Sequence, residues 1–329
     1  MTNQKIESFP PLVDPQNLQP LLPCDTGLCS KSGAKYQVLS GIPRVVPNLT
    51  NYADAFGEQW KRWRLTQLDS HTGTSITADR MNRCLGDELV NKLSGQGEIQ
   101  ILEAGCGAGR FTEVLLGYPV VRLTSSDLSS AVESNQINFP QDHRHRIVQC
   151  DICLAPFKPG SFDVVVCLGV IQHTPNPELT IQKLFEQVKP NGWLVIDHYA
   201  PSFKHYTKIT AMLLRPILKR LSPSLRMRAC EILTAMFLPA HKFFRHAPLA
   251  QKLLSRISPM LTYFHELPQL KDQLQYEWAL LDTHDSLTDW YKHLRTTTQI
   301  KSTLNKLGAV EIHVVPGGNG VEARCRKVA

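Results

Sequence analysis

The run Ile-Leu-Glu-Ala-Gly-Cys-Gly-Ala-Gly-Arg-Phe-Thr-Glu at residues 101–113 constrains the fold more than any other part of the chain. An apolar stretch leads into three alternating glycines, Gly105, Gly107 and Gly109, and a helix-compatible segment follows. Glycine lacks a Cβ, so the backbone can turn sharply here and approach a ligand closely. The run therefore predicts a strand, a nucleotide-binding turn and a helix, which together open an α/β fold.

The spacing of these glycines differs from that of dinucleotide-binding proteins. In the motif GxGxxG the last glycine would stand at position 110, which is Arg110 here. Glu103, just before the first glycine, would repel a pyrophosphate and favours a ligand with a cationic end, which S-adenosylmethionine has. Glu103 could equally hold the loop by accepting hydrogen bonds. The pattern therefore disfavours NAD.

Carboxylates end the next two apolar segments. Residues 120–127 are predicted as a second strand ending in Asp127, about 20 residues beyond the glycines, where nucleotide-binding α/β folds place a ribose-binding acid. Residues 146–151 are predicted as a third strand ending in Asp151. Both carboxylates are candidate ligand contacts.

Taken in order, these motifs resemble those of class I S-adenosylmethionine-dependent methyltransferases. Residues 161–175 are similar to the family's fourth strand and following loop, and residues 188–197 to its fifth strand. The resemblance implies S-adenosylmethionine as cofactor, with Asp127 at the ribose and Asp151 at the adenine amino group. The contacts that it implies are Glu103, Gly105, Gly107, Gly109, Asp127, Leu128, Asp151, Ile152 and Leu168.

The C-terminal residues predict a helix and a hairpin. Residues 289–308 are predicted as a helix with threonines at its start and glycine at its end. Two apolar runs, 309–315 and 321–326, flank a glycine-rich turn and predict an antiparallel hairpin. The resemblance implies that this hairpin ends a Rossmann-like, doubly wound sheet of seven strands, so the expected fold class is α/β.

We expect the core to comprise residues 80–200 and 287–329, with an N-terminal extension over 1–79 and a helical, basic insertion over 201–286 as a substrate lid. Residues 41–47 follow Cys24 and Cys29 and are similar to the ribbon-like module of some relatives. One cysteine pair supplies only half of a zinc site, so no metal is expected. Cys150 and Cys153 flank Asp151 at a strand end, which disfavours a redox pair.

Aromatic residues at 52, 56, 60 and 63 share one face of a predicted helix over 51–64. This helix either packs on the core or closes over the cofactor, in which case Gln59, Trp60 and Arg80 would contact its methionine end. In the insertion, eleven basic residues from Lys204 to Arg256 stand against Glu231 alone, whereas the whole chain carries only +7. A solvated helix face, an anionic acceptor and a membrane-surface contact all fit this charge, and nucleic acid is disfavoured because no base-stacking motif accompanies it.

Composition is consistent with a cytoplasmic enzyme. The start of the chain lacks the order of a signal peptide, and no stretch of 18 apolar residues occurs. Buried, reduced cysteines are expected in and beside the strands, at Cys106, Cys150 and Cys167.

Catalysis of methyl transfer mainly requires alignment, because the sulfonium donor is already activated. A hydroxyl or ammonium acceptor must also lose a proton, and His173, after the fourth strand, is the leading candidate base, although it could instead hold the loop. His198 and Tyr199 are the alternatives, and strand alternation allows only one of them to face the site.

The sequence thus predicts a methyltransferase acting at oxygen or nitrogen of a small molecule. Its alternatives are a lipid or quinone methyltransferase at a membrane surface and a cofactor-binding protein without catalysis.

Overall fold

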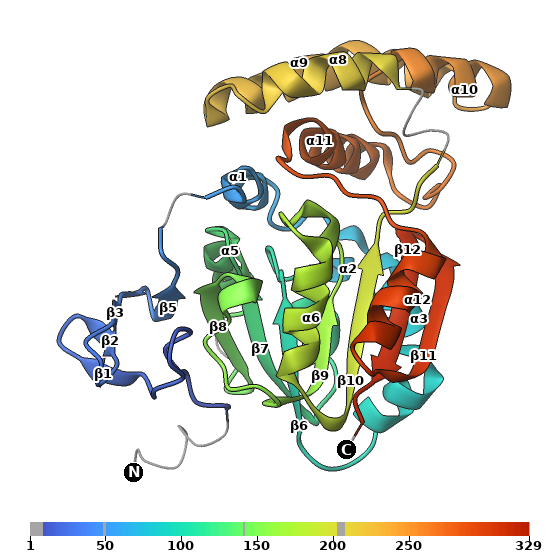
Figure 1. The fold of residues 1–329 in the computed structure, drawn as a ribbon. Coiled ribbons are helices and arrows are strands. Elements are labelled where there is room, and N and C mark those ends of the chain that lie inside the picture. Colours follow the sequence, from blue (N-terminus) through green and yellow to red (C-terminus); the bar gives the residue numbers. More distant parts are fainter. Residues whose placement is uncertain (1–8, 49–50, 141, 203–207, 329) are drawn as a thin grey trace.

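The computed structural model describes residues 9–48, 51–140, 142–202 and 208–328. The basic residue Lys204 and the first eight residues of the polar start lie outside these ranges. A mixed sheet of nine strands forms the centre of the molecule, and helices cover both of its faces (Figure 1). In spatial order the strands are β11 (Val310–Gly317), β12 (Gly320–Arg326), β10 (Val188–His198), β9 (Phe162–Cys167), β6 (Ile99–Ala104), β7 (Val121–Asp127), β8 (His145–Cys150), β5 (Ile42–Val45) and β4 (Val38–Leu39).

The α/β fold expected from the sequence is confirmed, with one correction to the sheet. Strands β6 to β10 run parallel, and β12 pairs antiparallel with β10 and β11, so the terminal hairpin is present. The sheet has nine strands instead of seven, because β5 of the N-terminal extension pairs with β8 and β4 pairs with β5. The register of β5 places Arg44 opposite Gln149.

Two layers of helices cover the two faces of the sheet. The central strands β6 and β9 are buried on both faces, as the continuous apolar run of a parallel sheet requires. Helices α6 and α12 pack against one face and α3 and α4 against the other. The helices of the core and extension are α1 (Asp54–Arg62), α2 (Asp69–Thr72), α3 (Ile76–Leu93), α4 (Arg110–Leu116), α5 (Ala131–Asn138), α6 (Pro177–Gln187) and α12 (Thr297–Lys306), with short 3-10 helices η1 (Ile152–Leu154) and η2 (Ile171–His173).

The long helix predicted over residues 289–308 is wrong in its first half. Only α12 is helical, and it begins after Thr296, whose side chain accepts a hydrogen bond from the backbone N–H of Gln299. The Gln299 side chain in turn accepts from the backbone N–H of Thr296, which completes a capping box. The cap fixes the start of the helix, and the residues before it connect α12 to α11.

Helices α8 (Ile209–Leu218), α9 (Pro223–Phe243), α10 (Pro248–Ile257) and α11 (Asp272–Thr288) follow the fifth strand of the expected core. In Figure 1, α11 lies above the carboxyl ends of the strands, and α8, α9 and α10 form the layer beyond it. Leu218 of α8 and Cys230 of α9 pack with Leu280 and Leu281 of α11. Among the described residues no helix is long and apolar enough to cross a membrane.

The expectations for the cysteines are confirmed in part. Cys106, Cys150 and Cys167 are free and buried, as expected. Cys24 and Cys29 form a disulfide, which the sequence did not predict. The bond joins β1 (Leu22–Cys24) to β2 (Gly27–Cys29) in a small sheet completed by β3 (Lys35–Tyr36).

Replacement of Ile42 by alanine tests whether the extension folds as one unit with the core. Ile42 of β5 is 1% exposed and packs with Cys106, Val132 and Ile147. We expect Ile42→Ala to lower the free energy of unfolding by about 2 to 5 kcal/mol in a single transition, since it leaves a cavity in a shared core. Urea denaturation measures this, with Val38→Ala at an exposed position of β4 as the control. An unchanged core transition would mean that the extension folds separately.

Candidate functional site

The glycine loop joins β6 to α4 with a backbone that only glycine adopts readily. Gly105 has a φ of 81°, and an added Cβ would lie 2.2 Å from the Val170 side chain. Gly109, the N-cap of α4, has a φ of 98°, and a Cβ there would lie 2.5 Å from the Phe139 ring. Larger residues would both strain the backbone and collide with packed side chains. The loop therefore keeps its tight path at the end of the first core strand.

Asp127 ties the end of β7 to this loop. Its carboxylate accepts hydrogen bonds from the Gly107 N–H at 2.9 Å, the Ser129 N–H at 2.8 Å and the Ser129 hydroxyl at 2.7 Å. Burial raises the pKa of Asp127, whereas these donors favour its ionised form. The carboxylate thus lies at the carboxyl end of its strand and directly beside the glycine loop.

Asp151 lies at the end of the next strand. It caps η1, accepting a hydrogen bond from the Cys153 N–H at 2.8 Å. Ile152 and Leu128 are half-buried, and Leu168 is buried in the core. Tyr52, which precedes α1, lies near Asp151. Burial is the main cause that raises the pKa of Tyr52, and the negative charge of Asp151 is the next.

Glu103 occupies a buried position behind the loop. Its carboxylate accepts hydrogen bonds from the Thr112 hydroxyl at 2.6 Å and the Ser125 hydroxyl at 2.8 Å. Burial raises the pKa of Glu103 to about 7. Through these two contacts Glu103 connects α4 to β7.

Helix α1 lies over the glycine loop. The Trp60 indole is 3.0 Å from where a Cβ on Gly107 would stand, and the Phe56 ring lies 5.1 Å from the His173 ring. Gln59 instead contacts His284, with 2.9 Å between its Oε1 and the histidine Nδ1. Arg80 forms an ion pair with Asp197 at the end of β10. Of these three predicted contacts, only Trp60 lies on the loop. Gln59 is bonded to His284, and Arg80 is paired with Asp197.

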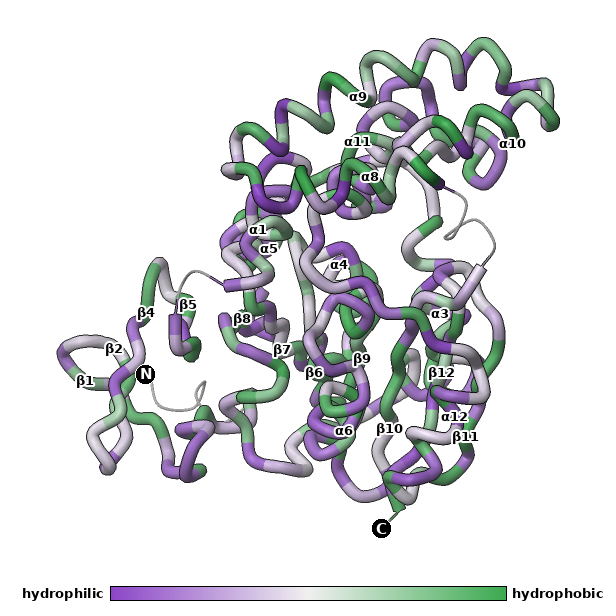
Figure 2. The backbone as a smooth tube through the Cα atoms, turned by 45° about the horizontal axis from the view of Figure 1, so that its top comes forward, coloured by the Kyte–Doolittle hydropathy of each residue, from purple (hydrophilic) through white to green (hydrophobic). Residues whose placement is uncertain are grey.

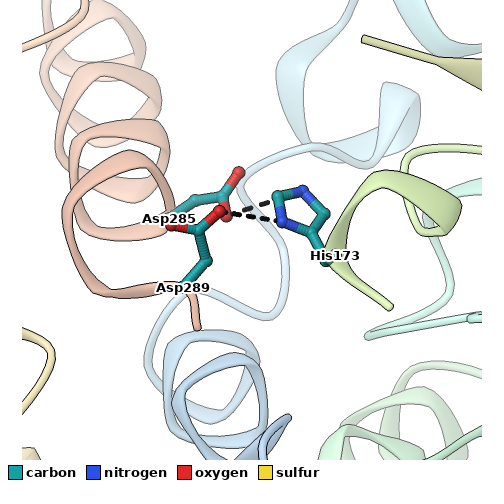
Figure 3. Close-up of side chains that lie close together, drawn as sticks. All are labelled: His173, Asp285 and Asp289. Atoms are coloured by element: carbon teal, nitrogen blue, oxygen red, sulfur yellow. Dashed lines mark hydrogen bonds and ion pairs between the residues drawn. The ribbon is translucent and has the colours of Figure 1, made fainter. Parts of the chain in front are cut away.

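His173 lies in η2, after the fourth core strand, and meets two carboxylates from α11 and its end (Figure 3). Its Nδ1 is 2.9 Å from Asp289 Oδ2, and its Nε2 is 3.9 Å from Asp285 Oδ1. Burial acts to lower the pKa of His173, but the two carboxylates outweigh it and raise that pKa above its usual value. Figure 3 shows both carboxylates on the same side of the imidazole.

Asp289 joins three elements of the structure. Its side chain is fully buried, and Arg215 of α8 lies 2.8 Å from its Oδ1 while His173 takes the other oxygen. Ligand atoms of His173, Asp285 and Asp289 lie within 4.8 Å of one another, a spacing that could suit a metal ion. The Arg215 guanidinium supplies one positive charge against the two carboxylates of this cluster.

The two alternative candidates at the end of β10, His198 and Tyr199, point to different surroundings, as strand alternation requires. The Tyr199 ring lies 5.3 Å from the His173 ring, and its hydroxyl is 3.4 Å from Asp285 Oδ2. His198 is buried elsewhere, with its Nδ1 bonded to the Tyr199 carbonyl at 2.9 Å, and burial lowers its pKa. Tyr199 therefore lies with His173, and His198 does not.

Sequence reasoning did not identify Asp285, Asp289 and Arg215 as site residues. The two aspartates stand four residues apart, which places them on one side of a helical turn. That spacing was visible in the sequence, but nothing there pairs it with a histidine 116 positions away.

Residues 102–196 match the profile of a family described as methyltransferase domain. The matched segment contains the glycine loop, both strand-end carboxylates and His173. This segment is similar to a methyltransferase domain, and it makes up less than a third of the chain. The chain is 29% identical over 116 residues to a ubiquinone biosynthesis O-methyltransferase of Leptothrix cholodnii, covering 34% of this chain and 47% of that protein.

A second relative of this chain is a malonyl-[acyl-carrier protein] O-methyltransferase of a Paenibacillus species. The two are 34% identical over 162 residues, which is 47% of this chain and 58% of the relative. The chain thus spans about half the length of these curated relatives. A solved structure, the CurJ carbon methyltransferase, superposes with a TM-score of 0.48 at 14% identity over 85% of this chain and 62% of that one.

The raised pKa of His173 can be measured by NMR titration of its ring. We expect a value above about 6.5, and a lower value in Asp285→Asn, because that change removes a carboxylate that stabilises the imidazolium. His173→Gln assigns the signal. His145, whose pKa burial lowers to about 4, lies outside the cluster and serves as the internal control. A His173 pKa below 6.5, or one unchanged by Asp285→Asn, would contradict the electrostatics described here.

Proposed function

We propose that this protein binds S-adenosylmethionine at the glycine loop beneath α1 and transfers its methyl group to an oxygen or nitrogen of a small molecule. The bound cofactor supplies the methyl group on a sulfonium, an activated donor. Support comes from the family match and from two relatives that are named O-methyltransferases. One observation supports the proposal most strongly. His173 is buried, its ring is bonded to Asp289, and it packs against α1, the helix that also lies on the glycine loop.

The cofactor-binding role rests on the fit between the loop and a nucleoside ligand. Three glycines with positive φ let the loop turn tightly, and carboxylates end the two following strands. We assign Asp127 to the ribose hydroxyls and Asp151 to the adenine amino group, with Leu128, Ile152 and Leu168 as apolar neighbours. Trp60 and the other aromatic residues of α1 would close over the methionine end.

His173 is proposed as the base that removes the acceptor's proton. Its Nδ1–H donates to Asp289, which leaves Nε2 as the atom that accepts a proton. Asp285, 3.9 Å from Nε2, stabilises the imidazolium that results. Tyr199, bonded to Asp285, would orient the acceptor, and His198 has no role in this scheme.

The division of the chain follows from this scheme as a proposal. Residues 80–200 and 287–329 would form the cofactor-binding core, residues 1–79 the extension with the lid helix, and residues 201–286 the substrate lid. Arg215 supports the last assignment, because it reaches from α8 to the base-orienting Asp289.

A second candidate is a lipid or quinone methyltransferase, favoured by the name of the Leptothrix relative.

The ribose assignment predicts weaker cofactor binding in Asp127→Ala. We expect an affinity loss of about 2 kcal/mol, close to 30-fold in Kd, because two charge-assisted hydrogen bonds disappear. Calorimetric titration with S-adenosylhomocysteine measures it, and Asp87→Ala, at an exposed position of α3, is the matched control. Equal affinity in Asp127→Ala and the native protein would remove Asp127 from the site.

If His173 is the base, its removal should slow methylation of an acceptor that must lose a proton more than methylation of an acceptor that is already ionised. With a catechol as hydroxyl acceptor, we expect His173→Ala to lower kcat by on the order of 100-fold or more. With a malonyl thioester, whose carboxylate carries no proton to remove, the loss should be much smaller. Activity toward the catechol should rise with pH through the raised pKa of His173, and Asp285→Asn should move that rise to lower pH.

Steady-state kinetics with the native protein, His173→Ala and His198→Ala separate these expectations. Equal losses with both acceptors would assign His173 a structural role. A larger loss in His198→Ala would transfer the base assignment to that residue.

A further inference from the structure

Helix α8 presents an apolar face to solvent. Its exposed positions recur three and four residues apart, which places them on one side of the helix. They are Ile209, Met212, Leu213 and Ile217. The opposite side already packs on the rest of the protein, with Ala211, Leu214 and Leu218 against α11 and its neighbours. The helix thus carries a second apolar face that this chain does not cover.

Helices α9 and α10 repeat this arrangement. Each has an exposed apolar stripe at helical spacing, although each also packs inward through other residues. In α9 the stripe is Leu225, Ile232, Met236 and Phe243, and in α10 it is Leu249, Leu253 and Ile257. Phe243 is 80% exposed and Leu249 is 84% exposed. Half of the exposed large apolar side chains in the described part of the chain belong to these three helices.

The three helices lie together on the outside of the molecule. Figure 1 places them beyond α11, on the side away from the sheet, and Figure 2 shows hydrophobic segments recurring along their backbone. Soluble proteins rarely expose apolar patches of this extent unless the patch binds something.

Charge identifies what this surface would bind. Residues 208–257 contain ten basic residues and one acidic residue, Glu231, which pairs with Arg62 of α1. Of the ten, Arg215, Arg226 and Lys242 pair with carboxylates outside this range. Exposed basic side chains stand within the apolar stripes themselves, with Arg228 one turn from Leu225 and Lys252 next to Leu253. Apolar side chains interleaved with cations match a layer of anionic headgroups above acyl chains.

We propose that helices α8, α9 and α10 form a docking surface for an anionic lipid membrane. The helices lie in the plane of the interface, their exposed apolar side chains enter the boundary between headgroups and acyl chains, and the basic side chains contact lipid phosphates. Helix α8 also supplies Arg215 to Asp289, so docking would hold the candidate site next to the lipid surface. The proposal does not depend on methyl transfer.

Co-sedimentation of the full chain with lipid vesicles tests the proposal. One set of vesicles contains phosphatidylcholine alone, and the other contains equal parts of phosphatidylcholine and phosphatidylglycerol. We expect the partition coefficient for the anionic vesicles to be at least ~10-fold higher, and to fall as salt is added.

Two double variants separate the contributions of charge and apolar contact. Arg228→Glu with Lys252→Glu, and Leu213→Ser with Leu249→Ser, should each weaken binding to the anionic vesicles by ~10-fold or more. All four positions are exposed, so folding should be kept, which thermal unfolding verifies. The matched controls are Lys301→Glu with Lys306→Glu on α12 and Ile137→Ser on α5, which are also exposed and should bind as the native protein does.

Three results would overturn the proposal. The first is absence of vesicle binding, and the second is equal binding to both kinds of vesicle. The third is a dimer in velocity sedimentation that Leu213→Ser with Leu249→Ser dissociates, combined with unchanged vesicle binding by that variant. The surface would then be an interface between two copies of this chain.

Discussion

The buried carboxylate of Asp289 links the sheet to the helices above it. A buried charge is costly unless it is paired and hydrogen-bonded, and Asp289 has both kinds of partner in His173 and Arg215. One partner belongs to the loop after β9 and the other to α8. Loss of either would leave one oxygen of this buried carboxylate without its partner, so the pairing holds the outer helices in a fixed place relative to the core. The position of His173 depends on the same contact.

Helix α1 contacts both the glycine loop and His173. Its Trp60 lies on the glycine loop and its Phe56 lies on His173, so a single short helix contacts the proposed cofactor loop and the proposed base. Gln59 on the same helix bonds to His284 of α11. Helix α1 thus packs on α11 and also lies on the glycine loop, and its closure over the cofactor stays a proposal.

Local pattern predicted the core strands well, because a buried parallel strand needs a continuous apolar run and its end is marked by glycine or a carboxylate. Local pattern did not predict features that depend on contacts between residues far apart in the sequence. The predicted helix extended back to residue 289, but the capping box at Thr296 starts the helix later. Strand β5 is a short apolar stretch whose pairing with β8 has no local signal. The pairing of His173 with Asp289 spans 116 positions, so spacing alone could not reveal it.

We propose that α1, the glycine loop and the end of β7 enclose one nucleoside-binding site. Hydrogen–deuterium exchange with and without S-adenosylhomocysteine tests it directly, because ligand binding slows local opening where the ligand makes contact. We expect slower exchange in residues 54–62, 103–110 and 127–129, and no such change with NAD. Unchanged exchange in α1, or the same protection with NAD, would contradict it.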